Sequence, residues 1–145
     1  MNARNHPRRA AGFTLIELLV VLLILGMIAG IAGPQVMNYL GESKTKGAKL
    51  QIEELSNSLD LFKLDAGRYP DTQEGLQALV QAPPSLTGDR WRGPYLKKKV
   101  IPKDPWNNDY RYTAPGKHGA FDIVALGSDG KDGGEGEAKD VNSWE

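Results

Sequence analysis

One carboxylate and one oxygen-rich stretch are the parts of this chain whose residues could do chemistry. Glu17 lies near the start of an apolar run that continues to Gly33. A charged side chain inside a membrane costs roughly 2.5–3.5 kcal/mol on insertion scales, so it is rarely retained without a partner. The sequence therefore predicts that Glu17 pairs with a cation.

The oxygen-rich stretch covers residues 126–144 and places carboxylates, two serine hydroxyls and one asparagine amide among glycines. Neighbouring carboxylates repel one another and a glycine-rich loop loses much chain entropy, so an ordered form needs a compensating cation. Calcium suits such oxygen ligands better than zinc, which would need Cys or His. Composition leaves open the alternative of a mobile, solvated terminus, although the aromatic Trp144 favours a tail that docks.

The apolar run is long enough to cross a membrane once. Residues 13–33 are 21 positions, which span about 31 Å at roughly 1.5 Å per helical residue, against a hydrocarbon core of about 30 Å. Arg4, Arg8 and Arg9 precede the run without any acidic residue, and basic flanks stay in the cytoplasm. The rest of the chain is expected to face outward.

Two interpretations of this amino-terminal segment compete. In the first it is a conventional secretory signal cleaved after Ala32, with Gly30 and Ala32 at the small-residue positions. In the second the chain is cut between Gly12 and Phe13 and keeps the whole apolar helix. The second is favoured, because a carboxylate close to the cut has no use in a discarded signal and the helical pattern continues past Pro34.

This helical pattern extends well into the polar part of the chain. An apolar stripe at spacings of three and four residues is expected to face the core: Ala48, Ile52, Leu55, Leu59 and Phe62. Gly67 suits a left-handed helix end, so one helix is predicted over about residues 14–64. Gly26, Gly30 and Pro34 leave open whether this helix loosens or kinks near its middle.

The region after the helix is predicted to form a small head. Asp71 and Glu74 have capping-box spacing ahead of a short second helix, and an irregular connection with one short strand near Leu96 follows. Residues 110–113 and 121–126 are typical of antiparallel strands joined by a turn. The predicted fold class is α+β: a long amino-terminal helix, transmembrane and then amphipathic, packed on a small antiparallel β-sheet.

Composition excludes several classes of protein. The 145 residues suit a single membrane-anchored domain. After residue 12 there are 15 Lys and Arg against 18 Asp and Glu, so the basic footprint of nucleic-acid binding is missing. The chain has no cysteine, which rules out disulfides and thiolate metal sites. His6 and His118 accompany no nucleophile motif or phosphate loop, so both are taken as bystanders and no enzyme is expected.

The motifs of the chain also carry a family resemblance. Residues 12–17 are similar to the processing site of the type IV pilin superfamily. Motifs of the head resemble the major pseudopilins of type II secretion systems, at residues 68–70, 74–76, 93–96, 104–106, 115–116, 127–130 and 133–136. The resemblance extends over nearly the whole chain.

The resemblance implies a processing and an assembly pathway. Prepilin peptidase would cut after Gly12, removing residues 1–12 as a leader peptide, and methylate the new amine of Phe13. Residues 13–33 would form the transmembrane and filament-core helix, and residues 34–145 the periplasmic head. Copies would polymerise at the bacterial inner membrane into a periplasmic pseudopilus that helps to export folded proteins. Implied partners are minor pseudopilins, the inner-membrane assembly platform and, indirectly, the secretin channel and the exported proteins.

The residues and the resemblance together assign roles to individual positions. Glu17 of one subunit is expected to pair with the charged amine of Phe13 in a neighbour, and Pro34 is a second assembly residue. The family also carries calcium in its terminal loop. The expected ligands are the side chains of Asp129 and Asp140, the carbonyls of Leu126 and Val141 and the hydroxyl of Ser143. Alternative functions are a type IV pilus major subunit and a secreted calcium-binding protein.

Overall fold

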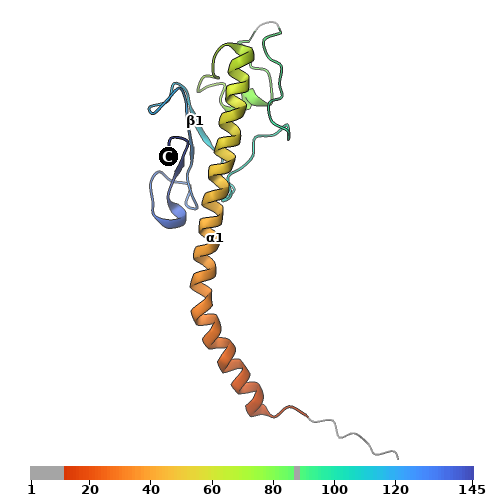
Figure 1. Ribbon diagram of the computed structural model, residues 1–145, viewed down its shortest axis with the longest axis vertical. Coiled ribbons are helices and arrows are strands. Elements are labelled where there is room, and N and C mark those ends of the chain that lie inside the picture. Colours follow the sequence, from red (N-terminus) through yellow and green to blue (C-terminus); the bar gives the residue numbers. More distant parts are fainter. Residues whose placement is uncertain (1–11, 87–88) are drawn as a thin grey trace, which may run out of the picture. The chain divides into compact units, whose positions relative to one another are not determined.

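The computed structural model describes residues 12–86 and 89–145. Of the predicted leader, residues 1–11 lie outside the described residues. The chain divides into two compact units, Met1–Asn38 and Tyr39–Glu145. One long helix, α1, has residues in both units, whereas the strands and the connecting loops belong to the second (Figure 1).

Helix α1 spans Leu15–Ala66, a length of 52 residues, and confirms the helix predicted over residues 14–64. As far as Met37 its large apolar side chains are exposed. By length and composition this helix can cross a membrane, where exposed apolar side chains meet lipid or other helices. Pro34 lies inside α1 without interrupting it, so the structure contains no break at this position.

Helix α1 ends at the glycine that the sequence indicated. Gly67 adopts a φ of +79°, and its N–H donates to the carbonyl of Lys63 at 2.8 Å. A left-handed residue at this position closes the last turn, and glycine adopts that conformation without steric cost. The predicted stop signal is therefore confirmed.

The segment after α1 contains the predicted capping box but not an α-helix. Asp71 accepts a hydrogen bond from the N–H of Glu74 at 2.8 Å, and its own N–H donates to the Glu74 carboxylate at 2.9 Å. The helix that follows is a four-residue 3-10 helix, η1 (Leu76–Leu79). The predicted short helix is thus present in a tighter and shorter form.

The strand predicted near Leu96 is wrong, since the described residues of this connection form no strand. The N–H of Tyr95 donates to the carbonyl of Leu79 in η1 at 2.8 Å, so the backbone pairs with a 3-10 turn instead of another strand. Leu96 itself is buried. Leu96 is therefore apolar because it packs into the core from a loop, and not because it belongs to a strand.

The sheet has three antiparallel strands in the order β1-β2-β3. Their bounds are Arg111–Thr113 for β1, Asp122–Ala125 for β2 and Val141–Asn142 for β3. The first two confirm the strands predicted at residues 110–113 and 121–126. The register places Tyr112 opposite Ile123 and Ala125 opposite Val141. Strand β3 was not predicted, because two residues are too few to show an alternating pattern.

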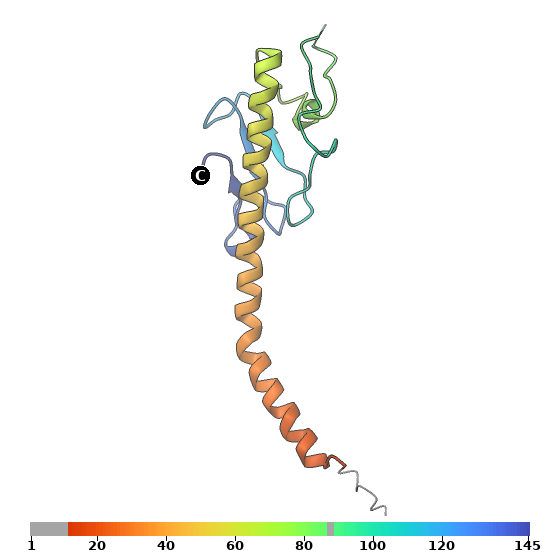
Figure 2. The same cartoon turned by 45° about the vertical axis from the view of Figure 1, so that its right-hand side comes forward.

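The hydrophobic core lies between α1 and this sheet. The predicted stripe is buried, with exposed fractions of 0–4%: Ala48, Ile52, Leu55, Leu59 and Phe62. These side chains cluster with residues of the strands, namely Tyr112, Ile123, Ala125 and Val141. Both views show the strands alongside the carboxy-terminal half of α1 (Figures 1 and 2). The predicted helix-on-sheet packing is therefore confirmed.

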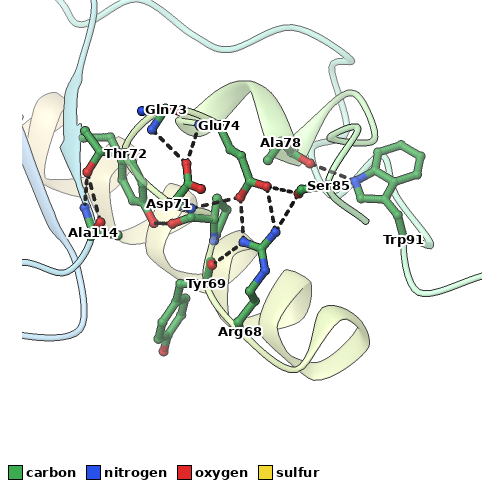
Figure 3. Close-up of polar contacts among 12 residues, drawn as sticks. Arg68, Tyr69, Asp71, Thr72, Gln73, Glu74, Ala78, Ser85, Trp91 and Ala114 are labelled. Atoms are coloured by element: carbon green, nitrogen blue, oxygen red, sulfur yellow. Dashed lines mark hydrogen bonds and ion pairs between the residues drawn. The ribbon is translucent and has the colours of Figure 1, made fainter. Parts of the chain in front are cut away.

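An ion pair ties the segment after α1 to the helix end, as Figure 3 shows. Two nitrogens of the Arg68 guanidinium donate to the two Glu74 carboxylate oxygens at 2.6 Å. The N–H of Asp71 and the hydroxyl of Ser85 donate to the same carboxylate, whose side chain is 9% exposed. The hydrogen bonds from Arg68 are the main reason that the pKa of Glu74 falls to about 2, despite its burial.

We expect Glu74→Gln to lower the free energy of unfolding by about 1–3 kcal/mol at neutral pH. The upper value of about 3 kcal/mol is the free energy that corresponds to the lowered pKa of Glu74. The lower value allows for solvent screening, because Arg68 is partly exposed. Because the pKa of Glu74 is lowered in the folded state, its contribution is complete above the unfolded pKa of about 4.3 and is lost as the pH falls towards 2.

Urea unfolding of the full chain in detergent, at neutral and at acidic pH, measures this difference. Glu53→Gln, on an exposed face of α1, is the matched control and should have little effect. A stability difference between parent and Glu74→Gln that stayed constant with pH would contradict the assigned role.

Candidate assembly site and terminal loop

The amino end of α1 carries a reciprocal cap made by Thr14 and Glu17. The N–H and the hydroxyl of Thr14 donate to one carboxylate oxygen of Glu17 at 2.8 and 3.0 Å. The N–H of Glu17 donates to the Thr14 hydroxyl oxygen at 3.3 Å. This is a capping box. The Thr-x-x-Glu spacing is a sequence signal for it, and the prediction of a cation partner for Glu17 missed that signal.

The residues around Glu17 form an exposed surface. Phe13 is 89% exposed, and apart from the adjacent residues and the nearby helix backbone no described heavy atom lies within 4 Å of a Cβ built at Gly12, Gly26 or Gly30. Between described residues, no Lys or Arg forms an ion pair with Glu17. Among the described residues, the partners of this carboxylate are therefore the neutral donors of Thr14.

The terminal loop connects β2 to β3, and its two ends lie together. Ala125 at the end of β2 pairs with Val141 at the start of β3. Leu126 and Asp140 are the next residues along the two strands, at the base of the loop. The structure thus brings together three of the five predicted calcium ligands, namely Leu126, Asp140 and Val141.

Backbone contacts close the loop just beyond this base. The N–H of Ser128 donates to the carbonyl of Glu137 at 2.9 Å. Gly127 has a φ of +63°, and a Cβ built there would lie 2.7 Å from the carbonyl oxygen of Ala138. Only glycine allows both this conformation and this close approach. The oxygen-rich stretch is therefore an ordered loop in this structure.

Asp140 has the unsatisfied oxygen that a cation would require. Its Oδ2 accepts a hydrogen bond from the N–H of Gly133 at 2.9 Å, whereas its Oδ1 is buried without a hydrogen-bond partner. A buried carboxylate oxygen without a partner is costly. No group of three or more His, Cys, Asp or Glu side chains among the described residues could hold a metal. Calcium also accepts carbonyl and hydroxyl ligands, so the predicted set fits this ion.

The other two predicted ligands have contacts of their own. Asp129 is exposed and accepts a hydrogen bond from the N–H of Lys131 at 3.0 Å. Ser143 accepts one from the N–H of Ile123 through its hydroxyl at 3.0 Å, and its own N–H donates to the Ile123 carbonyl at 2.9 Å. Carboxylate and hydroxyl oxygens keep further lone pairs, so both residues retain the capacity to bind a cation.

Asn108 supports the loop and was missed from the sequence. Its side-chain amide donates to the carbonyl of Gly127 at 2.9 Å. Its own position is held by Asp104, which accepts a hydrogen bond from the Asn108 N–H at 2.7 Å. No local pattern signals a contact between residues 19 positions apart.

The carboxy-terminal tail docks on the turn between β1 and β2, as Trp144 predicted. The rings of His118 and Trp144 stack with centroids 3.8 Å apart and an angle of 14°. His118 Nδ1 also lies 3.1 Å from the carboxylate of Asp122. Burial alone would raise the pKa of Asp122, but hydrogen bonds from Lys117 and His118 outweigh it and the pKa is lowered. His118, taken as a bystander, therefore has a structural role.

Comparison with known proteins shows which families this sequence resembles. A family profile described as "Type II secretion system (T2SS), protein G" matches residues 35–144, and one described as "Prokaryotic N-terminal methylation motif" matches residues 7–33. The chain is 46% identical over 143 residues to the type II secretion system core protein G of Pseudomonas aeruginosa, covering 95% of this chain and 97% of that protein. It is 42% identical to the Vibrio cholerae protein of the same description, covering 94% and 93%.

A solved structure is also similar to this chain. It is the crystal structure of the major pseudopilin from the type 2 secretion system of enterohaemorrhagic Escherichia coli, with a TM-score of 0.63 and 32% sequence identity. The match covers 77% of this chain and 95% of that one.

Proposed function

This chain belongs to the type II secretion system protein G family, and we propose that its subunits assemble through a charge pair between Glu17 and the amine of Phe13 in a neighbour. The chain is a pseudopilus subunit of type II secretion. Its apolar helix anchors it in the inner membrane, and its subunits form the periplasmic pseudopilus. A type IV pilus subunit and a secreted calcium-binding protein are not favoured.

Cleavage after Gly12 would create a positive charge at Phe13, whereas Glu17 forms no ion pair with the described residues of its own chain. The methylation motif over residues 7–33 supports processing by a prepilin peptidase, and both Gly12 and Phe13 are exposed. Methylation leaves the charge of the Phe13 amine in place. On this proposal residues 1–12 are the leader, residues 13–33 the membrane and filament-core segment, and residues 34–145 the periplasmic head.

The capping box supports the charge pair by providing a state in which Glu17 is tolerated before assembly. In the single chain, neutral donors of Thr14 bind one oxygen of the carboxylate. In a dry filament core, the ammonium group of a neighbouring Phe13 would attract it more strongly, because charge-assisted hydrogen bonds are stronger than neutral ones. Pro34 removes one backbone hydrogen bond from α1 and would let the helix loosen as subunits pack.

We also propose that the terminal loop binds calcium. The ligands would be the side chains of Asp129 and Asp140, the carbonyls of Leu126 and Val141 and the hydroxyl of Ser143. The buried, unpartnered Oδ1 of Asp140 supports this proposal, as does the closed base of the loop. Calcium would supply positive charge that offsets the repulsion between the two carboxylates.

The family role is that of a structural subunit, and we infer that catalysis is not part of it. The proposed partners follow from that role: further copies of the chain, minor pseudopilins and the inner-membrane assembly platform. The secretin channel and the exported proteins would be indirect partners. The contact of His118 with Asp122 and Trp144 supports a non-catalytic role for this histidine.

We expect both Glu17→Ala and Glu17→Gln to reduce filament formation by more than about tenfold, because breaking a buried charge pair costs about 3–5 kcal/mol. Cleavage after Gly12 should continue in both variants. Electron microscopy of fibres from overproducing cells counts the filaments, and mass spectrometry of the mature amino terminus reports cleavage and methylation. Glutamine can replace glutamate in a capping box, so normal filaments from Glu17→Gln would show that capping, not charge pairing, is what assembly needs.

Removal of calcium should destabilise the head by about 3 kcal/mol relative to a hundredfold excess of calcium over its Kd. This corresponds to a decrease in Tm of roughly 10 °C. Thermal melts of the full chain, with calcium or with a chelator, measure the difference. Asp140→Asn should abolish it, whereas Asp132→Asn in the same loop, where Asp132 pairs with Arg111 at the surface, should retain it. Equal Tm values for the parent with calcium and with chelator would rule out the site.

A further inference from the structure

The terminal loop rests on α1 at a glycine. Gly41 is buried within α1, and a Cβ built there would lie 2.5 Å from Cγ of Glu137 and 2.6 Å from its Oε1. The side chain of Glu137 therefore occupies the space that any larger residue at position 41 would fill. Both residues belong to the unit Tyr39–Glu145. We call this contact between Gly41 and Glu137 the seat.

The seat distinguishes Gly41 from the other glycines described in α1. Outside the helix backbone, no heavy atom lies within 4 Å of a Cβ built at Gly26, Gly30 or Gly33. At Gly47 the one such atom is Cγ of Pro105 at 3.6 Å, which is an ordinary van der Waals contact. Among these glycines, Gly41 is therefore the one where an added Cβ would displace a neighbour, namely the exposed side chain of Glu137.

The part of α1 that carries the seat is a weak helix by its sequence. Residues 41–47 include four poor helix formers, Gly41, Ser43, Thr45 and Gly47. The hydroxyl of Thr45 donates to the carbonyl of Gly41 at 3.1 Å, a backbone contact that slightly destabilises helices. A helix of low propensity depends on tertiary packing for its order, and Glu137 supplies packing at position 41.

The position of Glu137 is in turn set by the closure of the loop. Glu137 lies in the 3-10 helix η2 (Gly136–Ala138), and its carbonyl accepts a hydrogen bond from the N–H of Ser128 at 2.9 Å. The close approach of Gly127 to the Ala138 carbonyl packs the two arms of the loop against each other. The closed base of the loop therefore positions the backbone of Glu137 so that its side chain reaches α1 at Gly41.

We propose that Glu137, seated on Gly41, couples the order of the terminal loop to the order of α1 over residues 41–47. The regulation of α1 by calcium that would follow from this coupling rests on the proposed calcium site. A subunit with an ordered loop has a firm helix over residues 41–47, in the first part of its head, whereas a subunit with an open loop has a frayed helix there. The state of the loop thereby selects which subunits have a helix ready to pack in a filament.

Hydrogen exchange of the full chain in detergent, with saturating calcium or with a chelator, tests the coupling. In the parent, calcium should slow exchange about tenfold or more both in the loop and at residues 41–47. In Gly41→Ala the new Cβ displaces Glu137, so calcium should still protect the loop but no longer residues 41–47. Gly47→Ala gains the same helix propensity without displacing a neighbour and should respond like the parent.

Equal calcium protection of residues 41–47 in the parent and in Gly41→Ala would overturn the coupling, as would protection confined to the loop in the parent. If calcium slows exchange in neither region, the proposed calcium site is wrong. The coupling is then tested by two variants in the absence of metal. Glu137→Ala must then exchange several-fold faster at residues 41–47 than Glu137→Gln, which keeps the length of the side chain. Equal rates in these two variants would overturn the coupling.

Discussion

The constraint on which the proposed assembly depends is that the carboxylate of Glu17 needs a hydrogen-bonding or charged partner in an apolar helix. This group lies in the first turn of α1, and the turns that follow are apolar and exposed, so burying it as a charge in lipid would be costly. Thr14 provides neutral donors within the chain. A charged partner from a second subunit would provide a stronger interaction in a dry core. On the proposed assembly, the same carboxylate would exchange neutral donors in the single subunit for a charged partner in the filament.

The head keeps a glycine-rich loop in place by holding both of its ends. Strand β2 is buried against α1, and β3 pairs with it at the base of the loop. The carboxy-terminal tail then stacks on the turn between β1 and β2 through Trp144. These contacts bury one oxygen of Asp140 without a partner. If the loop binds calcium as proposed, its closed base would lower the entropy that binding costs.

Most of the regular structure could be predicted because its signals are periodic or local. The stripe from Ala48 to Phe62 indicated which face of α1 is buried, and the Asp71 and Glu74 spacing predicted their reciprocal hydrogen bonds. Predictions failed where a residue's environment comes from distant parts of the chain. Leu96 has the apolar character of a strand residue, yet the neighbouring Tyr95 pairs with η1. Strand β3 exists only because the tail returns to β2.

The sequence by itself determined the long helix, its buried stripe, its end at Gly67 and the abundance of oxygen-bearing side chains in the terminal loop. Each of these depends on neighbouring residues or on a simple period. Only the tertiary structure decided which distant groups meet. It placed Glu137 on Gly41 and left one oxygen of Asp140 buried without a partner. A helical glycine looks the same in the sequence whether its missing side chain would face solvent or another residue, since that difference arises only when the chain has folded.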